Sequence, residues 1–134
     1  MSYQKPYEER ADSDLQDELP PMMLLARKQA LNSTCRFKLG AVITKKGRIL
    51  GYGCNTKKTH PKYGSGRYRT LHCEGAAIYD CVKKGEDMEG ATIWIYRLNN
   101  NLAKPCPCCQ GLIEQFGITK AIYSGEYDAQ VQSC

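Results

Sequence analysis

Leu71-His72-Cys73-Glu74-Gly75 and, further along, Pro105-Cys106-Pro107-Cys108-Cys109 are the two stretches around which this 134-residue sequence is organised. Zinc in proteins prefers nitrogen and thiolate ligands, and a catalytic zinc takes three of them so that a fourth position stays open. His72, Cys106 and Cys109 give that number, and two cysteines three residues apart share one face of a helix. The sequence predicts a zinc site built from these residues, with Glu74 beside it as a proton carrier.

The other cysteines leave a second interpretation of the zinc site open. The chain has eight cysteines, and without a recognisable export signal they indicate metal ligands and buried thiols rather than a disulfide framework. A structural zinc is normally closed by a fourth Cys or His, which Cys73, Cys108 or His60 could supply. Glu74 in step with His72 favours the open, catalytic site.

Basic residues are concentrated in one part of the chain. The formal net charge is +5, and twelve Lys or Arg residues lie between Glu18 and the next acidic residue, Glu74. A solubilising surface is the simpler explanation for a run of charges. Twelve bases without an acid favour an anionic ligand, either a nucleotide phosphate or a single-stranded polynucleotide.

Helix and strand patterns alternate along residues 20–134. Periodic apolar residues, glycine stops and β-branched runs predict three helices and four strands: helices at 22–32, 72–84 and 106–116, and strands at 39–44, 48–53, 91–96 and 120–124. The first two strands form a hairpin at one end of the sheet, and right-handed crossovers link the later strands. The predicted fold is a three-layer α/β/α sandwich with a mixed four- to five-stranded sheet.

The chain is predicted to be one domain, residues 20–134, preceded by an acidic N-terminal arm, residues 1–19. No apolar run approaches the length that spans a membrane, and the N-terminus does not resemble a signal peptide, so we expect a cytoplasmic protein without membrane partners. Apolar helix faces on a small layered domain would allow it to self-associate as a homo-oligomer. Residues 55–71, a long stretch without helix or strand periodicity, are predicted to form a functional loop.

Four segments resemble the cytidine and deoxycytidylate deaminase superfamily, most closely its small deoxycytidylate-type members: residues 33–43, 51–55, 71–78 and 106–124. His-x-Glu followed by Pro-Cys-x-x-Cys is also the signature of zinc nucleobase deaminases. The resemblance implies that Asn55 binds the sugar, that the main-chain carbonyl of Lys104 meets the departing amine, and that Glu74 shuttles protons. The chain departs from the family pattern at Cys73, where alanine is more usual, in a longer segment at 97–104, and in a short C-terminus.

Three hypotheses for function follow. The first is hydrolytic deamination of cytosine to uracil in a free nucleotide or nucleoside, with dCMP preferred and Arg67 and Arg69 near the phosphate. The second is the same reaction on single-stranded DNA or RNA, with Tyr63 and Tyr68 available to stack bases. The third is a non-catalytic, zinc-stabilised module that binds nucleic acid.

Overall fold

A five-stranded mixed sheet forms the centre of the protein. The computed structural model describes residues 19–57, 72–100, 102–125 and 131–133. The strands are β1 (Leu39–Lys45), β2 (Arg48–Cys54), β3 (Thr92–Arg97), β4 (Lys120–Tyr123) and β5 (Val131–Ser133). Their order across the sheet is β2-β1-β3-β4-β5, in which only β3 and β4 are parallel neighbours.

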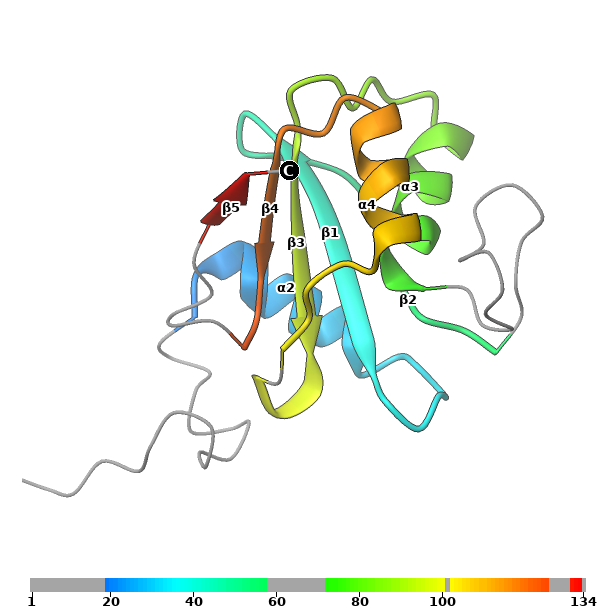
Figure 1. The fold of residues 1–134 in the computed structure, drawn as a ribbon, viewed down its shortest axis with the longest axis vertical. Coiled ribbons are helices and arrows are strands. Elements are labelled where there is room, and N and C mark those ends of the chain that lie inside the picture. The colour runs from blue at the N-terminus through cyan, green and yellow to red at the C-terminus, as the bar shows by residue number, and fades with distance from the viewer. Residues whose placement is uncertain (1–18, 58–71, 101, 126–130, 134) are drawn as a thin grey trace, which may run out of the picture.

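Helices cover both faces of this sheet (Figure 1). Helix α2 (Pro21–Ala30) lies on one face, while α3 (Cys73–Lys83) and α4 (Pro107–Gln115) lie on the other. A short 3-10 turn (Leu98–Asn100) follows β3. The prediction of an α/β/α sandwich with a mixed four- to five-stranded sheet is confirmed.

The core divides into two layers because successive side chains of a strand point to opposite faces. On β1, Ala41 and Ile43 pack toward α3 and α4, whereas Val42 packs with Met23 and Ala26 of α2. This alternation explains why β1, buried on both faces, has a continuous apolar run.

The predicted hairpin is present, with a two-residue turn at Lys46 and Gly47, whose φ values are 53° and 78°. In the sheet, β1 rather than β2 lies beside β3. The connection from β2 through α3 to β3 therefore crosses β1. Strand β5, which pairs antiparallel with β4, was not predicted.

Two glycines of β2 let α3 lie close to the sheet. A Cβ added to Gly51 would lie 2.6 Å from Cys81 Sγ, and one added to Gly53 would lie 2.8 Å from Ala76 Cβ. These distances are shorter than real Cβ contacts, so only glycine fits against the helix at this separation. The position of α3, and therefore of His72 at its beginning, depends on these glycines.

The predicted N-terminal arm lies almost wholly outside the described residues, as do residues 58–71 of the predicted loop. Within the described ranges, no helix combines the length and the apolar character needed to cross a lipid bilayer.

Candidate metal centre and its pocket

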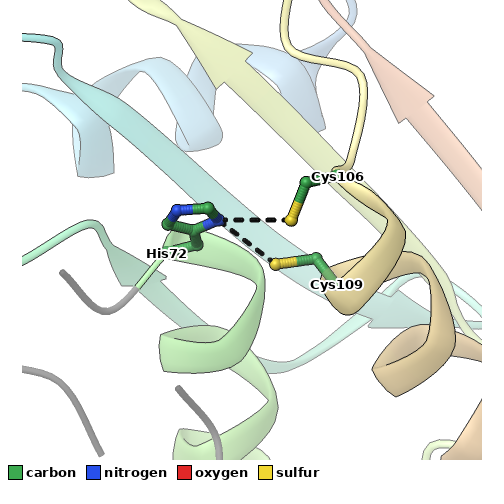
Figure 2. Close-up of side chains that lie close together, drawn as sticks. All are labelled: His72, Cys106 and Cys109. Carbon is green, nitrogen blue, oxygen red and sulfur yellow. Dashed lines mark hydrogen bonds between the residues drawn. The ribbon is translucent and has the colours of Figure 1, made fainter. Parts of the chain in front are cut away.

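The beginnings of α3 and α4 meet and form the centre of the site (Figure 2). His72 caps the N-terminus of α3, and Cys106 caps that of α4. Pro107 follows in the first turn of α4, where its missing N–H and fixed φ are compatible with a helix start. Both caps have extended backbone, and the positive ends of the two helix dipoles favour thiolate at this place.

The three predicted zinc ligands lie close together. The Nδ1 atom of His72 is 3.6 Å from Cys106 Sγ and 3.4 Å from Cys109 Sγ, and all three donor atoms lie within 4.8 Å of one another. Zinc bonds of about 2.1 Å to nitrogen and 2.3 Å to sulfur, arranged tetrahedrally, place nitrogen and sulfur about 3.6 Å apart. The spacing and the chemistry of the donors therefore fit zinc, and these residues could hold the ion.

Glu74 lies in the first turn of α3 and is buried, with 4% of its surface exposed. Its carboxylate oxygen Oε1 accepts a hydrogen bond from the thiol of Cys73 at 3.0 Å. Burial, together with the adjacent Glu74, raises the pKa of Cys73 well above its usual value, which keeps this thiol protonated. Cys73 therefore acts as a hydrogen-bond donor to Glu74.

A pocket of about 310 Å³ opens at the metal centre. It is lined by residues at the start of β1, at the ends of β2 and β3, at the starts of α3 and α4, and in the segment before α4. These residues are Phe37, Leu39, Asn55, His72, Cys73, Glu74, Arg97, Leu102, Ala103, Lys104 and Cys106. Glu74 is the one acidic side chain in this lining, and Arg97 and Lys104 are the basic ones among the described residues. The pocket can thus combine a buried carboxylate with positive charge.

Asn55 lines the pocket, but its side chain is largely engaged with the main chain. Its Oδ1 accepts a hydrogen bond from the backbone N–H of Leu39 at 3.0 Å, and its Nδ2 donates to the carbonyl of Phe37 at 2.6 Å. The Ser33 hydroxyl donates to the Asn55 carbonyl at 2.9 Å. Asn55 therefore ties the end of β2 to the chain entering β1, which the sequence did not reveal.

Lys104 also lines the pocket, two residues before Cys106, and its side chain is exposed. The segment that contains it is fixed to β4, because the N–H of Ala103 donates to the carbonyl of Ser124 at 2.9 Å. Arg67 and Arg69, predicted near a phosphate, lie outside the described residues, as do His60, Tyr63 and Tyr68.

Phe37 and Arg97 are pocket residues that the sequence did not single out. The Cζ atom of Arg97 lies 4.8 Å from the centre of the Phe37 ring, and that of Arg36 lies 5.4 Å from it. Phe37 falls in the 33–43 segment and Arg97 begins the 97–104 segment, but strand pairing between distant residues is what brings them together.

Three nitrogen and sulfur donors at two helix starts, with a buried carboxylate in the adjoining pocket, define a zinc-type hydrolytic centre on an α/β/α sandwich. The sequence model of the cytidine and deoxycytidylate deaminase zinc-binding region matches residues 15–125. The deoxycytidylate deaminase of Mycobacterium phage D29 is 32% identical over 123 residues, covering 76% of this chain and 90% of that protein.

Solved structures of deaminases share the fold of this chain. The dCMP deaminase of cyanophage S-TIM5 in its apo form has a TM-score of 0.63 and 26% identity, covering 94% of this chain and 89% of its own. The cytidine deaminase of Burkholderia pseudomallei shares the fold, with a TM-score of 0.65 and 20% identity over 84% of this chain and 89% of its own. The chain belongs to the cytidine and deoxycytidylate deaminase family of zinc-dependent hydrolytic enzymes.

Proposed function

We propose that this protein deaminates cytosine to uracil in a free nucleotide or nucleoside, with dCMP as the preferred substrate, and releases ammonia. The observation that carries the proposal is the position of Glu74: a carboxylate only 4% exposed lines the same pocket as His72 and Cys106. The related proteins of phage D29 and cyanophage S-TIM5 are deoxycytidylate deaminases, which supports dCMP as the substrate.

His72, Cys106 and Cys109 would hold the zinc ion, since their donor atoms have the spacing that a tetrahedral site requires. When bound, zinc supplies positive charge that lowers the pKa of water from about 16 to roughly 7.

Glu74 would carry the protons of the reaction. It takes one proton from the water that adds to C4 of cytosine and delivers it to the ring nitrogen N3. It then takes the second proton from the resulting C4 hydroxyl and gives it to the departing amine. The C4–N4 bond breaks, ammonia leaves, and the oxygen stays on C4 as the carbonyl of uracil. The Cys73 thiol holds Oε1 at 3.0 Å, which restrains the carboxylate and leaves its second oxygen for proton transfer.

Substrate contacts follow from the pocket lining and from the family. Asn55 would bind the sugar through its second amide N–H, because its first N–H and its carbonyl oxygen bond the main chain. The main-chain carbonyl of Lys104 would accept a hydrogen bond from the amine being lost. Arg67 and Arg69 remain proposed phosphate contacts that lie outside the described residues.

The decisive experiment compares substrates on the zinc-loaded protein. Ammonia release is measured with dCMP, CMP, deoxycytidine, cytidine and a cytosine-containing oligonucleotide, and we expect the largest kcat/KM with dCMP. Glu74→Gln keeps the side-chain shape and should lower kcat by about 10²- to 10⁴-fold with zinc content unchanged. Glu114→Gln, an exposed carboxylate on α4, is the matched control. Full turnover by Glu74→Gln would contradict the proton-shuttle role.

Deamination of single-stranded DNA or RNA is the second candidate function. Phe37 favours it, because this residue is 55% exposed beside the pocket and bases stack on aromatic side chains. Ammonia release from the oligonucleotide alone would establish this function and reject the first. Tight oligonucleotide binding with no turnover of any substrate would indicate the non-catalytic module.

We also expect a cytoplasmic homo-oligomer. Light scattering on the purified protein tests the oligomeric state, and a monomer at micromolar concentration would contradict it.

A further inference from the structure

The arginines beside the pocket form no ion pair with acidic side chains among the described residues. Arg36 and Arg97 both lie against the ring of Phe37, with their Cζ atoms 5.4 Å and 4.8 Å from its centre. The ion pairs among the described residues join other side chains: Lys45–Asp87, Arg48–Glu86 and Lys84–Asp80. Neither guanidinium has a carboxylate partner among the described residues, so an anion in the pocket can bind the guanidinium that lines it.

Arg97 is the member of this pair that lines the pocket. Its guanidinium stacks on Phe37, so its orientation is restrained before a ligand arrives, while its planar set of N–H groups suits two oxygens of a phosphate. Lys104 also lines the pocket, but its exposed side chain makes no hydrogen bond or ion pair with the described residues. Binding by Arg97 therefore loses less side-chain entropy.

The backbone of Arg97 is fixed to the segments that carry the site. Its N–H donates to the Ser124 hydroxyl at 2.9 Å, and the Ser124 carbonyl accepts from Ala103 at 2.9 Å, three residues before Cys106. The next residue, Leu98, donates to the carbonyl of Lys38 beside Phe37, at 3.0 Å. Arg97, Phe37 and the chain leading to the zinc ligands are thus held by one set of hydrogen bonds around a completely buried Ser124.

We infer that Arg97, restrained by its stacking on Phe37, binds the phosphate of the substrate and selects a nucleotide over the corresponding nucleoside. The inference rests on the proposed function and adds to it the residue that determines substrate class. The contact assigns the phosphate to the end of β3, in addition to any contact from residues 58–71. A nucleoside lacks this contact, so its binding should depend little on Arg97.

The test is a comparison of two arginines on the same ring. Arg97→Gln should raise KM for dCMP by about 10- to 100-fold and lower the ratio of kcat/KM for dCMP to that for deoxycytidine by a similar factor. Arg97→Lys, which keeps the charge without the planar fork, should recover part of the loss. Arg36→Gln removes the other guanidinium from the Phe37 ring. Because Arg36 does not line the pocket, this change should alter KM for dCMP by less than about threefold.

Binding measurements separate this inference from the proposed function. Calorimetric titration of the zinc-loaded Glu74→Gln protein with dCMP gives a dissociation constant that needs no turnover, and adding Arg97→Gln should raise it by about 10- to 100-fold. If wild-type protein turns over no cytosine substrate, the proposed function fails while this titration still tests Arg97. Equal effects of Arg97→Gln and Arg36→Gln on dCMP binding would overturn the inference.

Salt dependence distinguishes one phosphate from several. For dCMP, whose single phosphate has no condensed counterions to release, log Kd plotted against log salt concentration should have a small slope in wild type and a smaller one in Arg97→Gln. A slope of several units, measured with an oligonucleotide that also binds more tightly than dCMP, would overturn the assignment to a single nucleotide phosphate.

Discussion

Replacing Gly53 by alanine is a direct test of how the sheet positions the metal centre. Gly53 lies on β2 opposite Ala41 of β1, and its Cα faces the beginning of α3. An added Cβ would lie 2.8 Å from Ala76 Cβ, 2.9 Å from the Ala76 carbonyl carbon and 3.0 Å from the Ala77 nitrogen. Two of these three atoms belong to helical backbone, which cannot rotate away as a flexible side chain would.

The cost can be estimated from these contacts. Ordinary contact requires α3 and β2 to separate by roughly half an ångström or more, and overpacking of this kind costs about 1–3 kcal/mol. Because His72 caps α3, the shift also moves a proposed zinc ligand, and zinc sites tolerate only about 0.2 Å in ligand distance. We therefore expect Gly53→Ala to lower the free energy of unfolding by about 1–3 kcal/mol and to weaken zinc binding.

Urea unfolding followed by the fluorescence of Trp94, the single tryptophan, measures the stability, and titration with a competing chelator measures zinc affinity. Gly111→Ala is the matched control, because a Cβ there has no atom within 4 Å and alanine in a helix gains up to about 1 kcal/mol. If Gly53→Ala proves as stable as wild type and binds zinc equally well, close packing at β2 does not position α3.

Three further predictions concern other groups. Asn55→Ala removes both main-chain hydrogen bonds of that amide and should cost about 1–3 kcal/mol in urea unfolding, whereas an unchanged midpoint would show that these bonds contribute little. Burial raises the pKa of Cys81 from 9.0 to about 12, so between these pH values the folded protein keeps a proton that the unfolded chain releases. The free energy of unfolding therefore falls from about pH 9 toward pH 12, by at most about 1.4 kcal/mol per pH unit. Cys81→Ala should show a shallower fall in this free energy between about pH 9 and 11, and an identical fall would contradict the assignment to Cys81. Cys73→Ala and Cys108→Ala should each retain one zinc per chain by metal analysis, whereas Cys109→Ala should lose it, and loss of zinc in either of the first two would contradict the three-ligand site.

The helices and strands could be predicted because their signals are local. Glycines and prolines bound α3 and α4, the predicted 106–116 helix corresponds to Pro107–Gln115, and Lys46-Gly47 has the composition of a tight hairpin turn. Strand order is a different problem, since nothing local states that β1 lies beside β3. Strand β5 has only three residues, too few for a periodic pattern to be visible.

The centre of the site was predictable for the same reason, and its surroundings were not. His-x-Glu and Cys-x-x-Cys fix relative positions within one helix turn, so their spacing is informative. Arg97 lines the pocket because β3 pairs with β1, where its partner is Leu39, a residue far away in the sequence. In the sequence alone, nothing distinguished Arg97 from the other basic residues. The phosphate prediction was made for the 55–71 segment because several basic residues lie close together in its sequence, whereas the described pocket is lined by a different arginine, Arg97.

Whether the zinc site has three protein ligands or four depends on where the remaining thiols lie. Cys73 directs its S–H to the carboxylate of Glu74 at 3.0 Å, and Cys108, between Cys106 and Cys109, is exposed. Among the described residues, the cluster of donor atoms within reach of one ion contains His72, Cys106 and Cys109 and no fourth member. The hydrogen bond that occupies the Cys73 thiol also restrains Glu74 in the pocket, so the cysteine at a position where the family usually has alanine would support the proposed proton carrier. Three ligands together with a restrained carboxylate are what hydrolysis needs, whereas a fourth ligand from this position would leave a structural ion beside an idle acid.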